Sequence, residues 1–435
     1  MAKLRRGKGG SWKENFWVDK IIVGIVVVTI GFFISTAYRE HRDHNRIEIQ
    51  IDSSLQKADF RLDSGQYEDA IKLYEEIINT ILSKEFPHEY AWAQNNMGIA
   101  YYNLALAKDK ENNLNNAIQA YEQALKIRTV ESDPVNYATT QNNLGVAYKT
   151  LAEVRDKEEN CKRAIEAYEQ ALKIRTVESD PVNYATTQNN LGNAYRTLAE
   201  VRDKEENCKR AIEAYKQALK IRTVESDPVN YAATQNNLGV AYKTLAEVRD
   251  KEENCKRAIE AYEQALKIRT VESDPVDYAA IQNNLGNAYK TLAEVRDKEE
   301  NCKSAIEAYE QALKIRTVER YPVNCATTQN NLGNAYRTLA EVRDKGENCE
   351  IAIEAYEQAL KIRTVERDPV NYATTQNNLG NAYQTLANVR DKEENLANAI
   401  EAYEEALKIR TVEHYPIDYA ATQNNLKLAQ SRLLQ

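Results

Sequence analysis

The sequence repeats itself every 47 residues, and this period constrains the fold more than any other feature. The string Gln-Asn-Asn-Leu-Gly recurs from Gln141–Gly145 to Gln376–Gly380. A fixed period of this length is typical of a solenoid or array of small units, not of one compact core. All eight prolines follow the same spacing: Pro87, Pro134, Pro181, Pro228, Pro275, Pro322, Pro369 and Pro416.

Each unit is predicted to contain two helices. Ser179-Asp180-Pro181 indicates a helix start, because Asp caps helix N-termini and Pro fits the first helical position. Residues 182–202 and 206–225 each place apolar side chains on one face at a period of about 3.6 residues. Between them, Asp203 followed by Glu206 predicts a capping box. The fold class is therefore all-α, a solenoid of antiparallel helix pairs.

Glycine recurs in the middle of each first helix, although it is a poor helix former. We expect the missing Cβ to allow close approach where the two helices of a unit cross. At the last copy the position is Lys427, and no second helix follows it in the sequence. Residues 417–435 are therefore predicted to be a polar capping helix. The glycines are Gly98, Gly145, Gly192, Gly239, Gly286, Gly333 and Gly380.

The repeat resembles the tetratricopeptide repeat (TPR). Leu191-Gly192 with Tyr195 in the first helix, and Ala211 with Tyr215 in the second, match parts of its pattern. The resemblance covers residues 46–435, but the unit exceeds the family's usual ~34 residues and Gln188 stands where the family has Trp. The longer unit and the Asn-Asn-Leu string are similar to kinesin-light-chain-type repeats. The resemblance implies a right-handed superhelix of about eight helix pairs plus the cap, with the first helices lining a concave groove.

That alignment places three polar rows in the groove: the first Asn of each pair, the residue that follows Gly, and the residue that follows Tyr. An amide row can donate to and accept from the backbone of an extended peptide, and a basic row favours acidic partners. Alternatively, stacked amides bond one another and the ladder is purely structural; the second Asn of each pair, such as Asn190, is expected to be structural. The candidate partner-binding residues are Asn142, Asn189, Asn193, Asn236, Asn283, Asn287, Asn330, Asn334, Asn377, Asn381, Lys149, Arg196, Lys243, Lys290 and Arg337.

The sequence does not indicate an enzyme. It lacks a Gly-rich phosphate loop, zinc-ligand spacing and a nucleophile motif, so we expect no catalytic residue, metal or cofactor. The net charge of -8 argues against nucleic acid as a partner. The predicted function is a monomeric interaction scaffold that binds proteins or peptides, acidic or multivalent ones in particular. The alternative is a structural or self-assembling solenoid.

The N-terminal residues predict a single-pass membrane protein. Residues 21–38 form eighteen positions without a charge, about the shortest run that can span a bilayer. They follow a basic tail, residues 1–20, and precede a juxtamembrane linker, residues 39–45. The positive-inside rule then places the tail in the cytoplasm and the repeats on the outer side. A cleaved signal peptide is the alternative, because Ser35-Thr36-Ala37 has small residues at cleavage-site spacing.

Five of the six cysteines also follow the period. Equivalent positions in stacked repeats lie at least ~8–10 Å apart, beyond the reach of a disulfide. Leu114 and Leu396 occupy the same position in flanking repeats, so we expect the thiols to act as small buried hydrophobes. The five are Cys161, Cys208, Cys255, Cys302 and Cys349, with Cys325 as the sixth.

Overall fold

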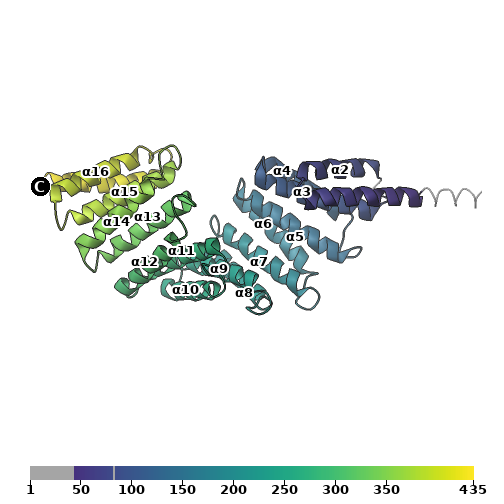
Figure 1. Cartoon of the computed structure of the whole chain (residues 1–435), viewed down its shortest axis with the longest axis horizontal. Helices are drawn as coiled ribbons and strands as arrows, with labels where there is room; N and C mark the ends of the chain where they lie inside the picture. The colour runs from purple at the N-terminus through teal and green to yellow at the C-terminus, as the bar shows by residue number, and fades with distance from the viewer. Residues whose placement is uncertain (1–43, 82–83) are drawn as a thin grey trace, which may run out of the picture. The chain divides into compact units, whose positions relative to one another are not determined.

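The structure is a computed structural model that describes residues 44–81 and 84–435 (Figure 1). Within these ranges every regular element is a helix and none is a strand, which confirms the predicted all-helical solenoid. The chain divides into two compact units, Met1–Ala147 and Tyr148–Gln435.

The first unit begins with helical residues 44–63. They are followed by α2 (Tyr67–Thr80), α3 (Pro87–Ala107) and α4 (Lys110–Leu125). Helix α5 (Pro134–Leu151) contains the division between the units. In the first unit, Asp59 accepts hydrogen bonds from the Tyr74 hydroxyl at 2.5 Å and from Asn96 Nδ2 at 2.9 Å. One carboxylate thus joins the first three helical segments.

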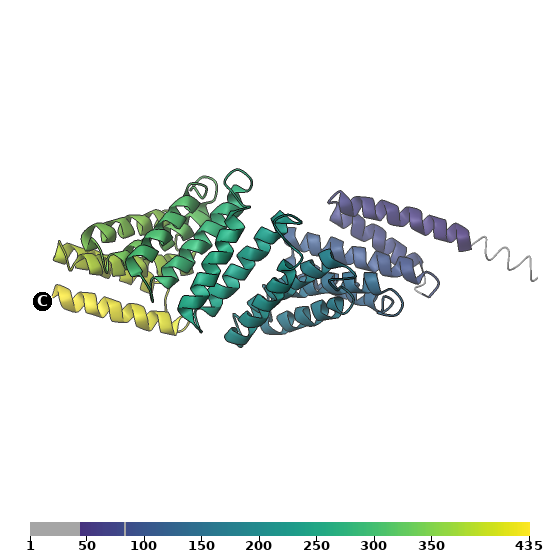
Figure 2. The ribbon, with the colours of Figure 1, turned by 90° about the horizontal axis from the view of Figure 1, so that it is seen from below.

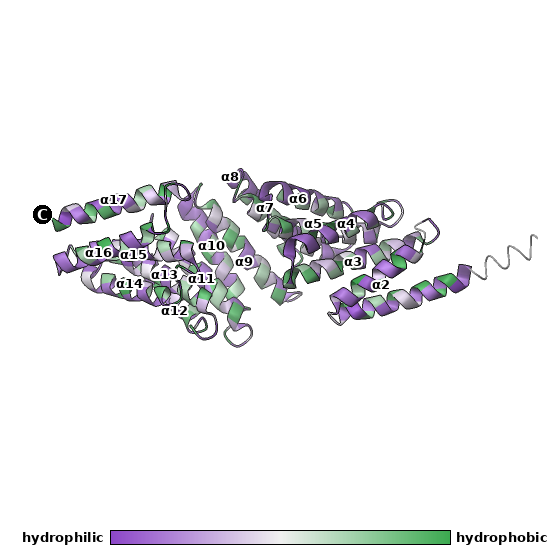
Figure 3. Cartoon of the chain, turned by 90° about the horizontal axis from the view of Figure 1, so that it is seen from above, coloured by the Kyte–Doolittle hydropathy of each residue, from purple (hydrophilic) through white to green (hydrophobic). Residues whose placement is uncertain are grey.

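The second unit is a regular series of helix pairs, and successive helices within it pack against one another (Figure 2). Its ribbons carry both hydrophobic and hydrophilic residues along most helices, as expected for elements buried on some faces only (Figure 3). The helices are α6 (Lys157–Leu172), α7 (Pro181–Leu198), α8 (Lys204–Leu219), α9 (Pro228–Leu245), α10 (Lys251–Leu266), α11 (Pro275–Leu292), α12 (Lys298–Leu313), α13 (Pro322–Leu339), α14 (Lys345–Leu360), α15 (Pro369–Leu386), α16 (Lys392–Leu407) and α17 (Pro416–Leu433).

A tyrosine of the second helix packs on the glycine of the preceding first helix in the repeats that begin with α3, α7, α9, α11, α13 and α15. Tyr215 is fully buried, and a Cβ added at Gly192 would lie 2.6 Å from its ring Cε1. Gly239 and Tyr262 repeat this contact at the same 2.6 Å. The predicted close approach is therefore present, and the group that needs the space is an aromatic ring. Lys427, at the equivalent position of α17, is exposed.

The predicted capping box is wrong. Asp203 has a φ of 41° and its side chain makes no cap hydrogen bond. Its carboxylate instead accepts from Arg202 Nε at 3.2 Å, while Asn207 Nδ2 donates to the carbonyl of Arg202 at 2.8 Å. The first helix is also shorter than the apolar pattern over residues 182–202 implies, because α7 ends at Leu198. The start at Asp180 is as expected, since its side chain accepts from the Asn183 amide at 3.3 Å.

The six cysteines are buried, as predicted for small hydrophobes. Burial raises the pKa of the Cys255 thiol to about 11. At neutral pH the thiol therefore stays protonated and packs as an apolar group.

The predicted localisation requires correction. No helix in residues 44–81 and 84–435 is long and apolar enough to cross a membrane, which contradicts the single-pass membrane protein with outward-facing repeats. The predicted anchor, residues 21–38, lies outside the described residues.

Candidate protein-binding face of the first helices

Apart from Lys149, which lies on α5, the candidate residues of the second unit lie on the first helices α7, α9, α11, α13 and α15. We call the rows of Asn189 and Asn193 on these helices the asparagine face. The Asn189 row comprises Asn189, Asn236, Asn283, Asn330 and Asn377. The Asn193 row comprises Asn193, Asn287, Asn334 and Asn381, with Val240 in place of asparagine on α9. Asn142, on α5, belongs to the first unit and is half-buried.

The side-chain carbonyls of the Asn189 row are held by the following repeat. Asn237 Nδ2 donates to Asn189 Oδ1 at 3.2 Å, and Asn284 Nδ2 donates to Asn236 Oδ1 at 3.1 Å. The next two repeats continue the pattern, from Asn331 to Asn283 at 3.3 Å and from Asn378 to Asn330 at 3.1 Å. The second asparagine of each pair thus links neighbouring repeats, as the structural alternative expects.

The carbonyls of the Asn193 row are also occupied. The hydroxyl of Tyr215, on α8, donates to Asn193 Oδ1 at 2.8 Å. The same bond joins Tyr309 to Asn287 at 2.7 Å, Tyr356 to Asn334 at 2.8 Å and Tyr403 to Asn381 at 2.8 Å. Burial raises the pKa of Tyr215, so the phenol remains a donor at neutral pH. Each asparagine of this row therefore satisfies a buried hydroxyl.

The remaining polar groups of the two rows are the amide –NH2 groups. In the residues that the structure describes, no hydrogen bond uses Nδ2 of any member of the Asn189 row or the Asn193 row. The sequence predicted side chains that both donate and accept. The structure instead leaves rows of donors whose orientation is fixed through their carbonyls.

The basic row is less uniform than predicted. Lys243 Nζ lies 2.6 Å from Glu247 Oε1, and Lys290 Nζ lies 3.6 Å from Glu294 Oε1; Lys149 pairs with Glu153 in the same way. Burial alone would raise the pKa of Glu247, but the charges and hydrogen bonds of Lys243 and Lys204 outweigh it and the net shift is downward. These lysines are therefore neutralised within the protein.

The two arginines of the row behave differently. Among the described residues, no carboxylate lies within 4.0 Å of the Arg196 or Arg337 guanidinium. The Nε of each is buried and has no hydrogen-bond partner. Only these two positions keep an unneutralised positive charge on the row.

Sequence reasoning missed a set of buried arginines that holds the first helices in place. Arg222 lies just after the end of α8 and is only 6% exposed. It donates from Nη1 to Thr234 Oγ1 at 2.9 Å and from Nη2 to Thr186 Oγ1 at 3.0 Å, which connects α7 with α9. Burial lowers the pKa of Arg222, and Asp227 opposes this shift. The sequence could have predicted this set, because an arginine recurs at the same position of seven successive repeats. The seven are Arg128, Arg175, Arg222, Arg269, Arg316, Arg363 and Arg410.

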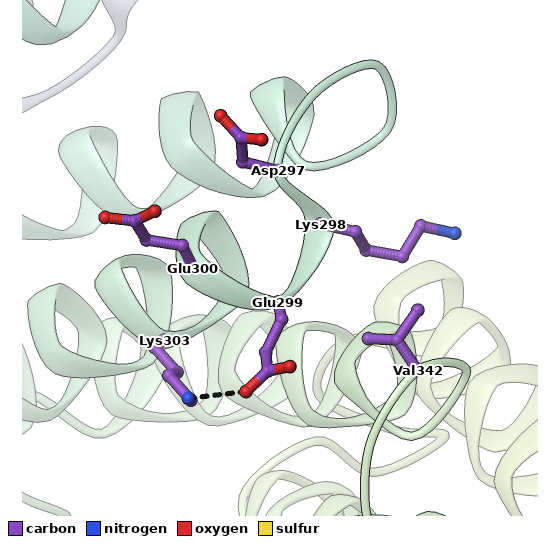
Figure 4. Close-up of a pocket in the computed structure, with 6 residues that line it drawn as sticks. All are labelled: Asp297, Lys298, Glu299, Glu300, Lys303 and Val342. Carbon is purple, nitrogen blue, oxygen red and sulfur yellow. Dashed lines mark hydrogen bonds and ion pairs between the residues drawn. The ribbon is translucent and has the colours of Figure 1, made fainter.

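A cavity of about 570 Å³ lies away from these rows, at the turns before α12 and after α13 (Figure 4). Glu299 and Lys303 line it and form an ion pair of 2.6 Å, and Glu299 also pairs with Arg343 of the next repeat. Asp297, Lys298, Glu300 and Val342 complete the lining. Its charges stabilise the stacking of repeats, so the asparagine face remains the stronger candidate site.

Two family models match the sequence. One, described as Tetratricopeptide Repeats-Sensor, matches residues 66–188. The other, described as Tetratricopeptide repeat, matches residues 185–225, 232–273 and 373–414. The sequence has no match among curated proteins.

Solved structures of similar fold share little sequence identity with the chain. The C-terminal part of a TPR repeat-containing protein from Cytophaga hutchinsonii is 15% identical, with 75% of this chain and 99% of that chain covered and a TM-score of 0.45. The apo form of RapI is 17% identical, with 88% and 95% covered and a TM-score of 0.48. A signal transduction ATPase with a tetratricopeptide repeat sensor from Pyrococcus horikoshii is 15% identical, with 84% and 52% covered and a TM-score of 0.42.

Proposed function

The chain is a tetratricopeptide repeat protein, and we propose that it is a protein–protein interaction scaffold that binds an extended segment of a partner on the asparagine face. The observation that carries this proposal is the set of amide –NH2 groups that no hydrogen bond within the described residues uses. Their carbonyls are fixed, so the donors are pre-organised and lose little freedom on binding.

The chemistry of the face selects the type of ligand. A row of donors matches a row of acceptors, and the backbone carbonyls of an extended peptide supply one acceptor per residue. Neighbouring packed helices lie ~8–10 Å apart, and an extended segment in the polyproline II conformation rises ~3.1 Å per residue and repeats its orientation every three residues. About three residues of the bound segment would therefore pass each repeat, and every third carbonyl would meet an asparagine.

The competing function is a structural or self-assembling solenoid whose asparagines serve only the scaffold. The amide bonds between repeats and the tyrosine–asparagine bonds support it, because both stabilise the array without a ligand. The two proposals differ in the use of the –NH2 groups. Only the peptide-binding function requires them.

The test removes the donors and keeps the acceptors. Peptides of twelve residues are selected from a displayed library on the full chain, and their affinities are measured for the parent and for the Asn236→Asp, Asn283→Asp double variant. The new carboxylates can still accept from Asn284 and Asn331, so the repeats remain linked. We expect at least tenfold weaker binding.

The control is Gln264→Glu, an amide-to-carboxylate change on the second helix α10 that α16 already has at Glu405. This variant should bind the selected peptides with an affinity within twofold of that of the parent. If the double variant retains its helicity and melting temperature and binds the peptides as the parent does, or if no peptide can be selected, the asparagines serve the scaffold alone.

A further inference from the structure

Two repeats of the second unit combine a donor of the asparagine face with an unneutralised guanidinium. They are the repeat of α7 and α8, with Asn193 and Arg196, and the repeat of α13 and α14, with Asn334 and Arg337. The intervening repeats carry Lys243 beside Val240 and Lys290 beside Asn287, and the last carries Gln384 beside Asn381. The combination is therefore specific to two positions in an otherwise closely similar array.

The two positions are built in the same way. In the first, the Tyr215 hydroxyl donates to Asn193 Oδ1 at 2.8 Å; in the second, Tyr356 donates to Asn334 Oδ1 at 2.8 Å. Burial raises the pKa of each tyrosine, and the nearby arginine, Arg196 or Arg337, opposes that rise. Each guanidinium thus lies beside a phenol that is itself fixed by the asparagine.

The arginines lack the partner that the lysines have. Glu200 stands one turn after Arg196, but it pairs with Lys157 of the preceding repeat at 2.8 Å. Glu341 likewise pairs with Lys298 at 2.7 Å and not with Arg337. The Nε of each arginine is buried without a hydrogen-bond partner among the described residues. The rest of each guanidinium lies near a tyrosine hydroxyl, Tyr215 or Tyr356, and not near a carboxylate of any described residue.

A carboxylate is the group that these donors recognise best. The planar guanidinium can bind both carboxylate oxygens, and charge-assisted hydrogen bonds of this kind are stronger than neutral ones. The adjoining asparagine –NH2 supplies a further donor. We propose that Asn193 with Arg196, and Asn334 with Arg337, form two equivalent subsites for acidic side chains of a segment bound on the asparagine face.

This inference rests on the proposed peptide-binding function and adds a spacing to it. The subsites are three repeats apart, and each repeat passes about three residues of a chain in the extended polyproline II conformation, in which residues nine positions apart face the same side. The matching partner segment therefore carries two acidic residues about nine positions apart. Once one subsite is occupied, the second carboxylate binds intramolecularly, at a raised effective concentration.

The test uses two synthetic fourteen-residue peptides of alanine and serine, one with glutamate at positions 3 and 12 and the other with glutamine there. Fluorescence anisotropy measures their binding to the full-length parent, Arg196→Gln, Arg337→Gln and Lys243→Gln. Glutamine is already present at this position as Gln384, so these variants should fold. We expect the glutamate peptide to bind the parent at least tenfold more tightly than the glutamine peptide.

Each arginine variant should weaken binding of the glutamate peptide about tenfold and leave the glutamine peptide unchanged. Lys243→Gln should change neither by more than twofold, because Glu247 already neutralises Lys243. An equal loss in Lys243→Gln would show a general positive field and overturn the subsites. Equal binding of both peptides, with loss in the Asn236→Asp, Asn283→Asp variant, would also overturn them and leave the peptide-binding face intact. Failure of the glutamate peptide to bind at all would overturn the subsites, while the selected peptides would still test the face.

Discussion

The repeat of α7 and α8 and the repeat of α9 and α10 differ at four of 47 positions, three of them on the first helix. Thr186 becomes Ala233, Asn193 becomes Val240 and Arg196 becomes Lys243; the fourth change is from Lys216 to Glu263. The buried apolar residues are otherwise the same. The changes therefore alter polar contacts and leave the packing of the helix pair unchanged.

The difference is clearest at the arginine that follows each repeat. Arg222 bonds Thr186 and Thr234. Arg269 has Ala233 and Ile281 at those two places, and it binds Asp274 at 2.5 Å and Asp277 at 3.4 Å. Asp277 stands where α9 has Asn230. A buried charge thus keeps a partner when its hydroxyl acceptors are lost, because a carboxylate is supplied nearby.

The largest expected effect comes from the contact that both repeats share. Gly192→Ala places a Cβ 2.6 Å from the Tyr215 ring, and Gly239→Ala does the same to Tyr262. Alanine is the better helix former, but overpacking against a buried ring costs more, so we expect a net loss of about 3 kcal/mol in each variant. Urea unfolding followed by circular dichroism measures it.

Lys427→Ala is the matched control, because no tyrosine-bearing helix follows α17 in the described residues. Its unfolding free energy should stay within about 0.5 kcal/mol of the parent. Clearly unequal losses in the two glycine variants would mean that the repeats are not equivalent in their cores.

The next largest effect tests the hydrogen bond between Arg222 and Thr234, which joins neighbouring repeats. Thr234→Ile removes the acceptor of Arg222 Nη1 and should cost about 2 kcal/mol, because a buried charged donor is left unpaired. Asn230→Asp in the same chain recreates the arrangement at Arg269 and should restore about half of the loss. Unfolding of the parent, the two single variants and the double variant gives the coupling free energy. A coupling near zero would refute the compensation between Ile281 and Asp277.

A smaller effect concerns the cysteine that both repeats retain. Burial raises the pKa of Cys255 to about 11, whereas an unfolded thiol titrates near ~8.5. Between these values the unfolded state has lost the proton and the folded state has kept it. The unfolding free energy should therefore fall with rising pH by about 1.4 kcal/mol per pH unit for this thiol. It should not depend on this thiol below pH ~8.

The comparison for this effect is Cys255→Ala, which retains every tyrosine and loses one thiol. Its unfolding free energy should fall less steeply than that of the parent between pH 9 and pH 10.5. Equal slopes in the two proteins would show that the thiol is not protected by burial.

Much of the fold followed from spacing alone. The period predicted the array, Asp180-Pro181 predicted a helix start, and the glycine at a helix crossing predicted the close approach to Tyr215. The candidate site was less predictable. Whether the Asn189 carbonyl is free depends on which side chain of the following repeat reaches it, and the period does not fix that register. The left-handed Asp203 was missed because the same residues also match a capping box.

The smallest expected effect comes from exchanging the residues at positions 193 and 240 between the two repeats. Asn193→Val removes the acceptor of the buried Tyr215 hydroxyl and should cost about 1 kcal/mol, the usual net value of one hydrogen bond. Val240→Asn offers an acceptor to Tyr262 at the equivalent position and should gain a similar amount. Thermal unfolding of both variants and of the double swap measures the two signs. If Val240→Asn destabilises the protein, then Tyr262 packs on α9 differently from the way Tyr215 packs on α7. The two repeats would then be less alike in structure than in sequence.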